Sequence, residues 1–406
     1  MLCNPLLVSA QDEVELQFSE EFKRLVINDT HGSVPNNLEL PQETQIITPQ
    51  ILQDSNSVDT HSRFFNGISQ TARSIYNLQV EQLDAPKPLL SEALTKHYEH
   101  GLLESLHTWG VIQSNFDTMM TEGENGYTKF NPALVNVLFD GQFKGGKEGF
   151  RLMLDPSHQH NRPFMQQIVQ DAYFETKRIP HHTIMFGNSR TGTGYEGAQS
   201  PYTLPFINRS QISRNLANIR KVGLRVRGNY PLVEYDLGGY SSDTFFTEFM
   251  PGVEFDGWVN LKPLAKTNGK YGNLTTGGGI VSGARNSVDY FVGGVYVGYE
   301  YKKFWTRMEY AVSDGSNGGS GLTTKRRQGW YVTLGYHITK KLELLARYDE
   351  FDPDKTISHN NQREYTAGMN YYIKGQALKL ILNYIYCQNQ VKADSHRILT
   401  GFQLAL

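Results

Sequence analysis

Between about residue 130 and the C-terminus, apolar and polar residues alternate one by one, which is the period of a β-strand with two different faces. In residues 330–338 the polar face carries Thr333 and His337, and the other face carries Trp330, Val332, Leu334, Tyr336 and Ile338. The segments 342–349, 378–386 and 397–406 alternate in the same way. The predicted strands have about 8–12 residues, close to the length of a tilted strand that crosses a lipid bilayer.

The connections between these segments differ in length. Tight turns are expected at 229–230, 339–340 and 375, and longer polar loops at 313–327 and 352–363. Short turns at one end and long loops at the other are typical of membrane barrels, with the short turns in the periplasm and the loops outside the cell. The sequence therefore predicts an all-β fold, a transmembrane up-and-down antiparallel β-barrel of about 16 strands, with about 14 or 18 as alternatives.

Aromatic residues near the predicted strand ends fit the two belts that membrane barrels place at the lipid–water interfaces. A soluble sandwich would bury these side chains instead, but its strands are usually shorter, about 5–6 residues. The candidates for the belts are Trp305, Tyr310, Trp330, Tyr348, Tyr371, Tyr372, Tyr384 and Tyr386.

The N-terminal third of the chain has a different character. Residues 1–10 end in Val8-Ser9-Ala10, a small-residue pattern that suits the tail of a signal peptide, with a disordered terminus as the alternative. Residues 11–85 are polar and are expected to be largely flexible. In residues 86–128 we predict a helical periplasmic segment that the barrel (129–406) does not need. The apolar positions that suggest this helix are Leu90, Leu94, Tyr98, Leu102, Leu106 and Trp109.

Composition narrows the function. The chain has 406 residues and a formal charge of −2, which does not favour a nucleic-acid-binding protein. Cys3 and Cys387 are its only cysteines, too few for a disulfide scaffold or a cysteine-based metal site. Three histidines recur in the predicted helix without an acidic partner at matching spacing, so no metal or other cofactor is expected; they are His97, His100 and His107.

An enzyme and an anchoring protein are the two rival classes. A barrel hydrolase needs a nucleophile beside a base, and the candidates are His181 and His182 and the loop residues Asp155, Ser157, His158 and His160. No Gly-x-Ser-x-Gly motif accompanies them, so an enzyme is not expected. An adhesin or envelope-anchoring barrel remains the alternative to a diffusion channel.

Residues 130–406 resemble the phosphate-selective porins of outer membranes, the O and P porins. The resemblance lies in GWYVT (329–333), ARYDEFDP (346–353), EYTAGMNYY (364–372) and KLILNY (379–384), and in FGNSR (186–190) followed by FINRS (206–210). It implies a homotrimer of sixteen-stranded channels with basic residues for anions on the inner wall. The chain departs from the family pattern at 192–196, where the family has a Pro-Phe-Gly-like turn, and at Leu406, where most barrels end in an aromatic residue.

Alternation also sorts the charged residues by face. In residues 220–227, Val222, Leu224 and Val226 should face lipid, so the charged residues between them face the lumen, because a charge in lipid costs about 2–4 kcal/mol at the midplane. The weak strand character of 208–220 predicts a loop that folds into the lumen. The candidate pore-lining residues are Arg190, Arg209, Arg214, Lys221, Arg225, Arg227, Glu234, Asp236, Arg307, Arg347 and Arg397.

Two interpretations of these residues stay open. In one, the arginines form the basic side of a constriction, with Glu234 and Asp236 opposite, and anions pause there. In the other, the arginines bind these carboxylates and loop carbonyls and only hold the structure. Either way the sequence predicts a porin of the bacterial outer membrane for passive diffusion of small hydrophilic solutes, with a mild preference for anions, phosphate among them. The expected partners are membrane lipid, lipopolysaccharide and two further copies of the chain.

Overall fold

The computed structural model describes residues 88–156, 168–217, 219–243, 248, 251–267 and 269–406. The predictions for 1–10 and 11–85 fall outside these residues, as do Ser157, His158 and His160 of the histidine-rich loop. No helix in the described ranges is long and apolar enough to cross a membrane.

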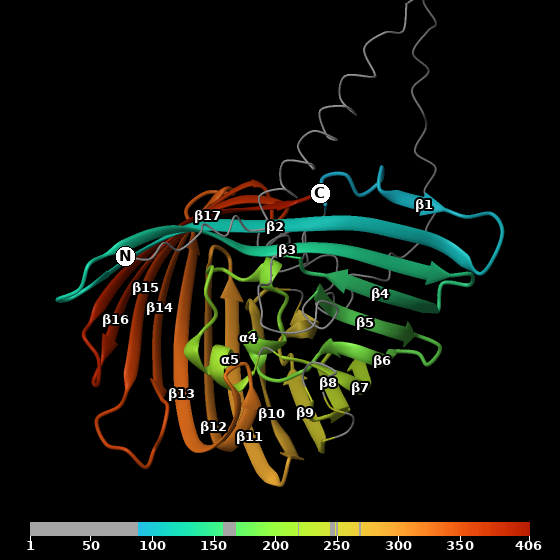
Figure 1. Ribbon diagram of the computed structural model, residues 1–406. Helices are drawn as coiled ribbons and strands as arrows, with labels where there is room; N and C mark the ends of the chain where they lie inside the picture. Colours follow the sequence, from blue (N-terminus) through green and yellow to red (C-terminus); the bar gives the residue numbers. More distant parts are fainter. Residues whose placement is uncertain (1–87, 157–167, 218, 244–247, 249–250, 268) are drawn as a thin grey trace, which may run out of the picture. The chain divides into compact units, whose positions relative to one another are not determined.

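Sixteen strands of the described part pair with their neighbours in one antiparallel ring, β2 to β17, which closes through β17 and β2 (Figure 1). This confirms the predicted all-β barrel and its strand number. The strands of the ring are β2 (Leu103–Thr121), β3 (Tyr127–Phe143), β4 (Glu148–Leu154), β5 (Val169–Thr176), β6 (His182–Arg190), β7 (Arg220–Asn229), β8 (Val233–Ser241), β9 (Val253–Leu261), β10 (Asn273–Arg285), β11 (Val288–Tyr301), β12 (Phe304–Gly318), β13 (Gly321–His337), β14 (Leu342–Asp352), β15 (Gln362–Lys374), β16 (Leu378–Asn389) and β17 (Ser395–Ala405).

The two faces of the ring differ as the alternation requires. On β13 the polar Thr333 and His337 are buried inside, whereas Leu334 and Tyr336 are exposed on the outer face. Large apolar side chains stay exposed around the ring, among them Phe186, Leu224, Phe255, Ile280 and Val295. An apolar outer surface over a polar interior is the arrangement of a barrel that sits in lipid.

The predicted helix at the N-terminal side is wrong. Residues 103–121 form β2, which pairs with β3 on one side and β17 on the other, and the short β1 (Thr95–His97) pairs with the first part of β2. The barrel therefore begins at Leu103 and not at 129. A three- to four-residue spacing of leucines is a weak helix signal, and pairing along both edges of β2 outweighs it.

The tight turns are confirmed at 230–232, 338–341 and 375–377, and a longer loop at 353–361. The long loop predicted for 313–327 is wrong, because β12 and β13 extend through it and leave only 319–320 as the turn. A bulge between Asp314 and Ser316 keeps the pairing, and Gly315 takes the left-handed conformation there, with φ of 68°. Glycine-rich sequence thus marks a bulged hairpin here rather than a loop.

Most of the predicted belt residues lie on the outer face. Ring contacts run along it through Trp330, Tyr348, Tyr365 and Tyr386, each ring within 6 Å of the next. The prediction is wrong for Trp305 and Tyr372, because both are buried inside the ring. They occupy inward positions, where Trp305 Nε1 and Tyr372 OH donate to the same carboxylate, Glu343.

Candidate functional site

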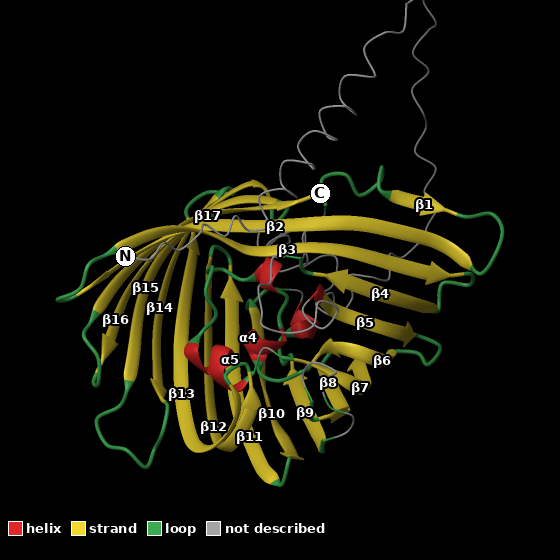
Figure 2. Ribbon diagram, viewed as in Figure 1, coloured by secondary structure: helices red, strands yellow, loops and turns green. Residues whose placement is uncertain are grey.

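The connection between β6 and β7, residues 191–219, folds into the barrel, as predicted for its second half; we call it the luminal loop. Within it lie α4 (Tyr195–Ala198), the 3-10 turn η1 (Pro201–Thr203) and α5 (Gln211–Leu216), drawn inside the ring of strands in Figure 2. Residue 218 is outside the described part. Most of the described loop residues are buried, so inner-wall side chains must satisfy the loop's backbone groups.

Glu309 of β12 holds the start of the luminal loop. Its carboxylate accepts hydrogen bonds from the backbone N–H groups of Tyr195 and Glu196 at 2.8 and 3.3 Å, and from the Tyr331 hydroxyl at 3.1 Å. The neighbouring Gly194 has φ of 73°, and a Cβ there would lie 2.7 Å from Glu309 Oε1. The glycine-rich 192–196 segment, a departure from the family pattern, is therefore the part that fits tightly against the wall.

Further along, four strands of the wall hold the loop backbone. Lys379 of β16 donates to the carbonyl of Leu204 at 3.0 Å, and Asn370 of β15 donates to that of Pro205 at 2.9 Å. The N–H of Gln211, at the start of α5, donates to Asp349 of β14 at 2.7 Å. The other such contacts are Ile207 N–H to Asn383 and Gln403 to the Tyr202 carbonyl.

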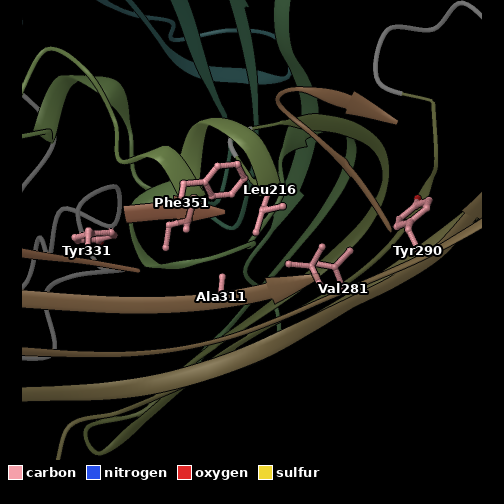
Figure 3. Packing of buried hydrophobic residues seen from close by; sticks show 8 residues of the cluster. Leu216, Val281, Tyr290, Ala311, Tyr331 and Phe351 are labelled. Carbon is pink, nitrogen blue, oxygen red and sulfur yellow. The ribbon is translucent and has the colours of Figure 1, made fainter. Parts of the chain in front are cut away.

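The end of the loop is held by apolar contact. Ile212 and Leu216 of α5 pack against a patch of the inner wall on β10 to β14, shown in Figure 3. The wall residues of this cluster are Val281, Tyr290, Val292, Ala311, Tyr331 and Phe351. Burying each aliphatic side chain is worth about 1.5–3 kcal/mol, which fixes α5 to one side of the lumen.

Arg209 and Arg347 were predicted to line the pore, but both are buried, Arg209 within the luminal loop and Arg347 on β14 beside it. Arg209 donates to the carbonyls of Glu196 and Gln199, the latter at 2.6 Å, and burial lowers its pKa to about 10. Arg347 donates to the Asn208 carbonyl at 3.1 Å and lies 3.5 Å from a Glu196 oxygen. In the structure these two arginines therefore bind loop carbonyls.

The predicted residues of β7 and β8 lie together, but on one wall rather than opposite each other. Arg225 Nε donates to Asp236 Oδ1 at 2.8 Å, with a second bond to Oδ2, so this pair is bidentate. Arg227 Nε lies 3.9 Å from the same Oδ2. Glu234 accepts from Lys262 and, at 2.8 Å, from Asn260. Asp236 therefore pairs with arginines of the adjacent strand, which we expected across the lumen, whereas Glu234 pairs with Lys262.

Most of the other candidates pair with a carboxylate on a strand of the wall. Lys221 is fully buried and binds Glu254, so it too does not face the open lumen. The guanidinium of Arg307 lies 3.7 Å from Glu300 on the neighbouring strand β11. At the end of β6, the backbone carbonyl of Arg190 accepts a hydrogen bond from the Arg225 guanidinium. The remaining pairs are Arg214 with Glu364 at 2.7 Å and Arg397 with Asp117 at 2.6 Å.

Where one partner of an inward pair reaches solvent, it is mostly the cation. The side chain of Arg397 is 26% exposed and that of Asp117 is 0%; for Arg151 and Asp140 the values are 30% and 14%. Arg214 is 33% exposed against 13% for Glu364. The Arg307–Glu300 pair is an exception, because its carboxylate is the more exposed partner, at 14% against 6%. The other three pairs are thus neutral as pairs, but their positive groups are the more exposed.

Replacing Arg225 should destabilise the barrel. In Arg225→Gln the buried Asp236 keeps only the more distant Arg227, and removing one partner of a buried ion pair costs about 3–5 kcal/mol. We expect the free energy of unfolding to fall by about that amount, measured by urea unfolding in lipid vesicles. Arg225→Gln with Asp236→Asn should restore most of it, because the uncompensated charge is gone. A single variant as stable as the wild type would contradict this assignment.

No group of three metal-ligating side chains occurs among the described residues. His97 and His107 are on paired strands, but the ring of His107 stacks on Trp109 at 6.2 Å. Sequence reasoning missed the carboxylates that pair with the inward arginines and with Lys221, namely Asp117, Asp140, Glu196, Glu254, Glu300 and Glu364. The alternation of residue types could have placed the carboxylates on strands at the inner face. No such sequence signal existed for Glu196, which lies in the loop.

Comparison with known proteins agrees with the barrel and the inward loop described above. Residues 259–406 match the family model of the phosphate-selective porins O and P. A comparison with curated protein sequences finds no match. Among solved structures the chain is similar to an anion-selective porin from Comamonas acidovorans, with a TM-score of 0.57 and 11% identity over 74% of this chain and 99% of that one. It is also similar to the outer membrane channel DcaP of Acinetobacter baumannii, with a TM-score of 0.54 and 10% identity over 77% and 99% of the two chains.

A third similar structure is OmpF of Salmonella typhi in complex with daunomycin, with a TM-score of 0.56 and 12% identity over 76% and 99% of the two chains. Identities this low establish the fold and nothing finer. The sixteen-stranded ring with its inward loop is an outer-membrane porin-like β-barrel, and residues 259–406 of this chain are similar to the phosphate-selective porins O and P.

Proposed function

We propose that the chain forms a channel for passive diffusion of small hydrophilic solutes and ions, with a mild preference for anions. The observation that carries the preference is the exposure of the inward ion pairs: Arg151, Arg214 and Arg397 reach the lumen, and their carboxylates lie deeper in the wall. A solute therefore meets positive groups first. Because each charge has a partner close by, the attraction is weak, which favours general diffusion over a dedicated phosphate channel.

The test removes exposed cations without changing the net charge. In the variant Arg151→Gln/Asp140→Asn/Arg397→Gln/Asp117→Asn, two whole pairs become neutral. If exposure sets the selectivity, the reversal potential of the channel in a KCl gradient moves toward zero in planar bilayers. The matched control is Arg326→Gln/Asp314→Asn, an exposed pair on the outer side of the barrel end, which should leave the potential unchanged. A pair-neutral variant with the wild-type potential would refute the role of exposure.

The assembly is proposed to be a homotrimer in lipid and lipopolysaccharide. One similar structure, OmpT of Vibrio cholerae, is described as a trimer form, with a TM-score of 0.53 and 12% identity over 74% of this chain and 99% of that one. The apolar outer face supports contact with lipid or with other copies. Cross-linking of the refolded protein tests the oligomeric state.

A further inference from the structure

A cavity of about 150 Å³ lies between the first part of the luminal loop and the inner wall from β7 to β11. From the loop side Tyr195 and Gln199 line it, and from the wall Arg227, Trp258, Asn260 and Tyr296. A cavity of roughly this volume can hold a six-membered aromatic ring.

One side of the cavity is an ordered aromatic surface. The rings of Tyr195 and Tyr296 lie 4.8 Å apart at 49°, and Trp258 stacks on Tyr296 at 6.3 Å and 23°. Tyr195 is fixed, because its N–H donates to Glu309 and the Arg307 guanidinium lies 5.3 Å from its ring centre. Tyr195 and Tyr296 are only half-buried, whereas Trp258 is buried behind them. Two partly exposed tyrosine rings in an ordered aromatic cluster favour a flat ring as ligand.

The charged groups at the cavity are unequal in exposure. Arg227 is 23% exposed, whereas Arg225 and Asp236 are each 8% exposed and Glu234 is 5% exposed. A solute in the cavity therefore meets the Arg227 guanidinium before the other charges. A guanidinium binds a carboxylate through two parallel N–H groups, which favours an acid over a neutral ring.

The carboxylates at the cavity are already engaged. Asp236 is bound on both oxygens by Arg225, and Glu234 accepts from Lys262 and Asn260. They offer little to the many hydroxyl groups of a sugar acid, since each hydroxyl that enters must find a partner. The charged groups of the cavity therefore favour a solute that brings one anionic group to Arg227.

We propose that this cavity binds small aromatic monocarboxylates and delays their passage through the channel. The proposal rests on the anion-preferring channel argued above and adds a class of solute to it. The aromatic ring of the bound solute stacks on Tyr195 and Tyr296, and the carboxylate of the solute binds Arg227.

The test compares organic anions in planar-bilayer recordings of the full-length protein. Benzoate should reduce the chloride current in a concentration-dependent manner, and acetate, glucuronate and inorganic phosphate at equal ionic strength should do so far less. Tyr296→Leu should raise the half-blocking concentration of benzoate by roughly three- to tenfold. Arg227→Gln should raise it by at least about tenfold.

Two further variants keep the test decisive. Tyr195→Leu changes the loop instead of the wall and should weaken the benzoate block as Tyr296→Leu does. It therefore replaces Tyr296→Leu in the test if that wall variant folds poorly. Tyr310→Leu makes the same exchange on the outer face and should leave the block unchanged. Benzoate block no stronger than that of acetate, while the chloride preference persists, would overturn this proposal alone. If glucuronate blocks as strongly as benzoate, the assignment of aromatic solutes to the cavity is wrong. If the wild-type channel shows no preference for chloride, the proposed function itself is refuted.

Discussion

A chain that lacks residues 11–128 is expected to form no barrel, whereas a chain that lacks only 11–87 forms one. The longer deletion removes β2, whose two edges pair with β3 and β17. Without it, both neighbours carry unpaired N–H and C=O groups into the hydrocarbon region, where each unsatisfied group costs several kcal/mol. The ring cannot close on fifteen strands without a new register along β3 and β17.

The heat modifiability of each deletion variant on gels shows whether it forms a barrel. After refolding in detergent, the 11–87 deletion should migrate differently on gels with and without boiling, as folded barrels do. The 11–128 deletion should give a single unfolded band and no channel activity. A heat-modifiable band from the longer deletion would mean that β2 is dispensable and that the barrel begins at β3, as the sequence alone suggested.

The alternation of residue types was sufficient to predict the barrel wherever the two faces of a strand differ in polarity. On β7 it correctly places Leu224 outside and Arg225 inside. It failed on β2 for a physical reason. There the inward Trp109 and Val111 are apolar, because they pack with Tyr202 of the luminal loop and not against water. A loop that covers part of the wall makes the inner face apolar, and the alternation on which the prediction depends is lost.

The site was predictable only in part for a related reason. Alternation gives the side of the wall on which a charge lies, but not its height on the wall or its partner. Arg397 and Asp117 are 280 residues apart in sequence and become partners through the closure of β17 on β2. Burial decides what each arginine does, and it depends on where the luminal loop lies. This is why Arg209 and Arg347 hold the loop while Arg227 and Arg397 reach solvent.

Replacing residues 194–216 with a short Gly-Ser linker is expected to raise the single-channel conductance several-fold. The replaced segment contains α4, η1 and α5, which pack against the inner wall and occupy part of the lumen. Sixteen strands enclose an aqueous channel, so the space that this segment leaves fills with water and ions. The wall groups that it covered, such as Glu309 and Lys379, gain water as a hydrogen-bond partner, and the barrel should persist because the strand pairing is unchanged.

Conductance in KCl and the size of the largest polyethylene glycol that enters the pore provide the measurement. Shortening the loop at 355–359, whose residues are all exposed, is the matched control and should leave both quantities near the wild-type values. The linker variant should also lose the difference between benzoate and acetate, because Tyr195 is gone while Arg227 remains. A folded linker variant with wild-type conductance would mean that ions do not pass the luminal loop, and that the narrowest part of the channel lies elsewhere along the barrel.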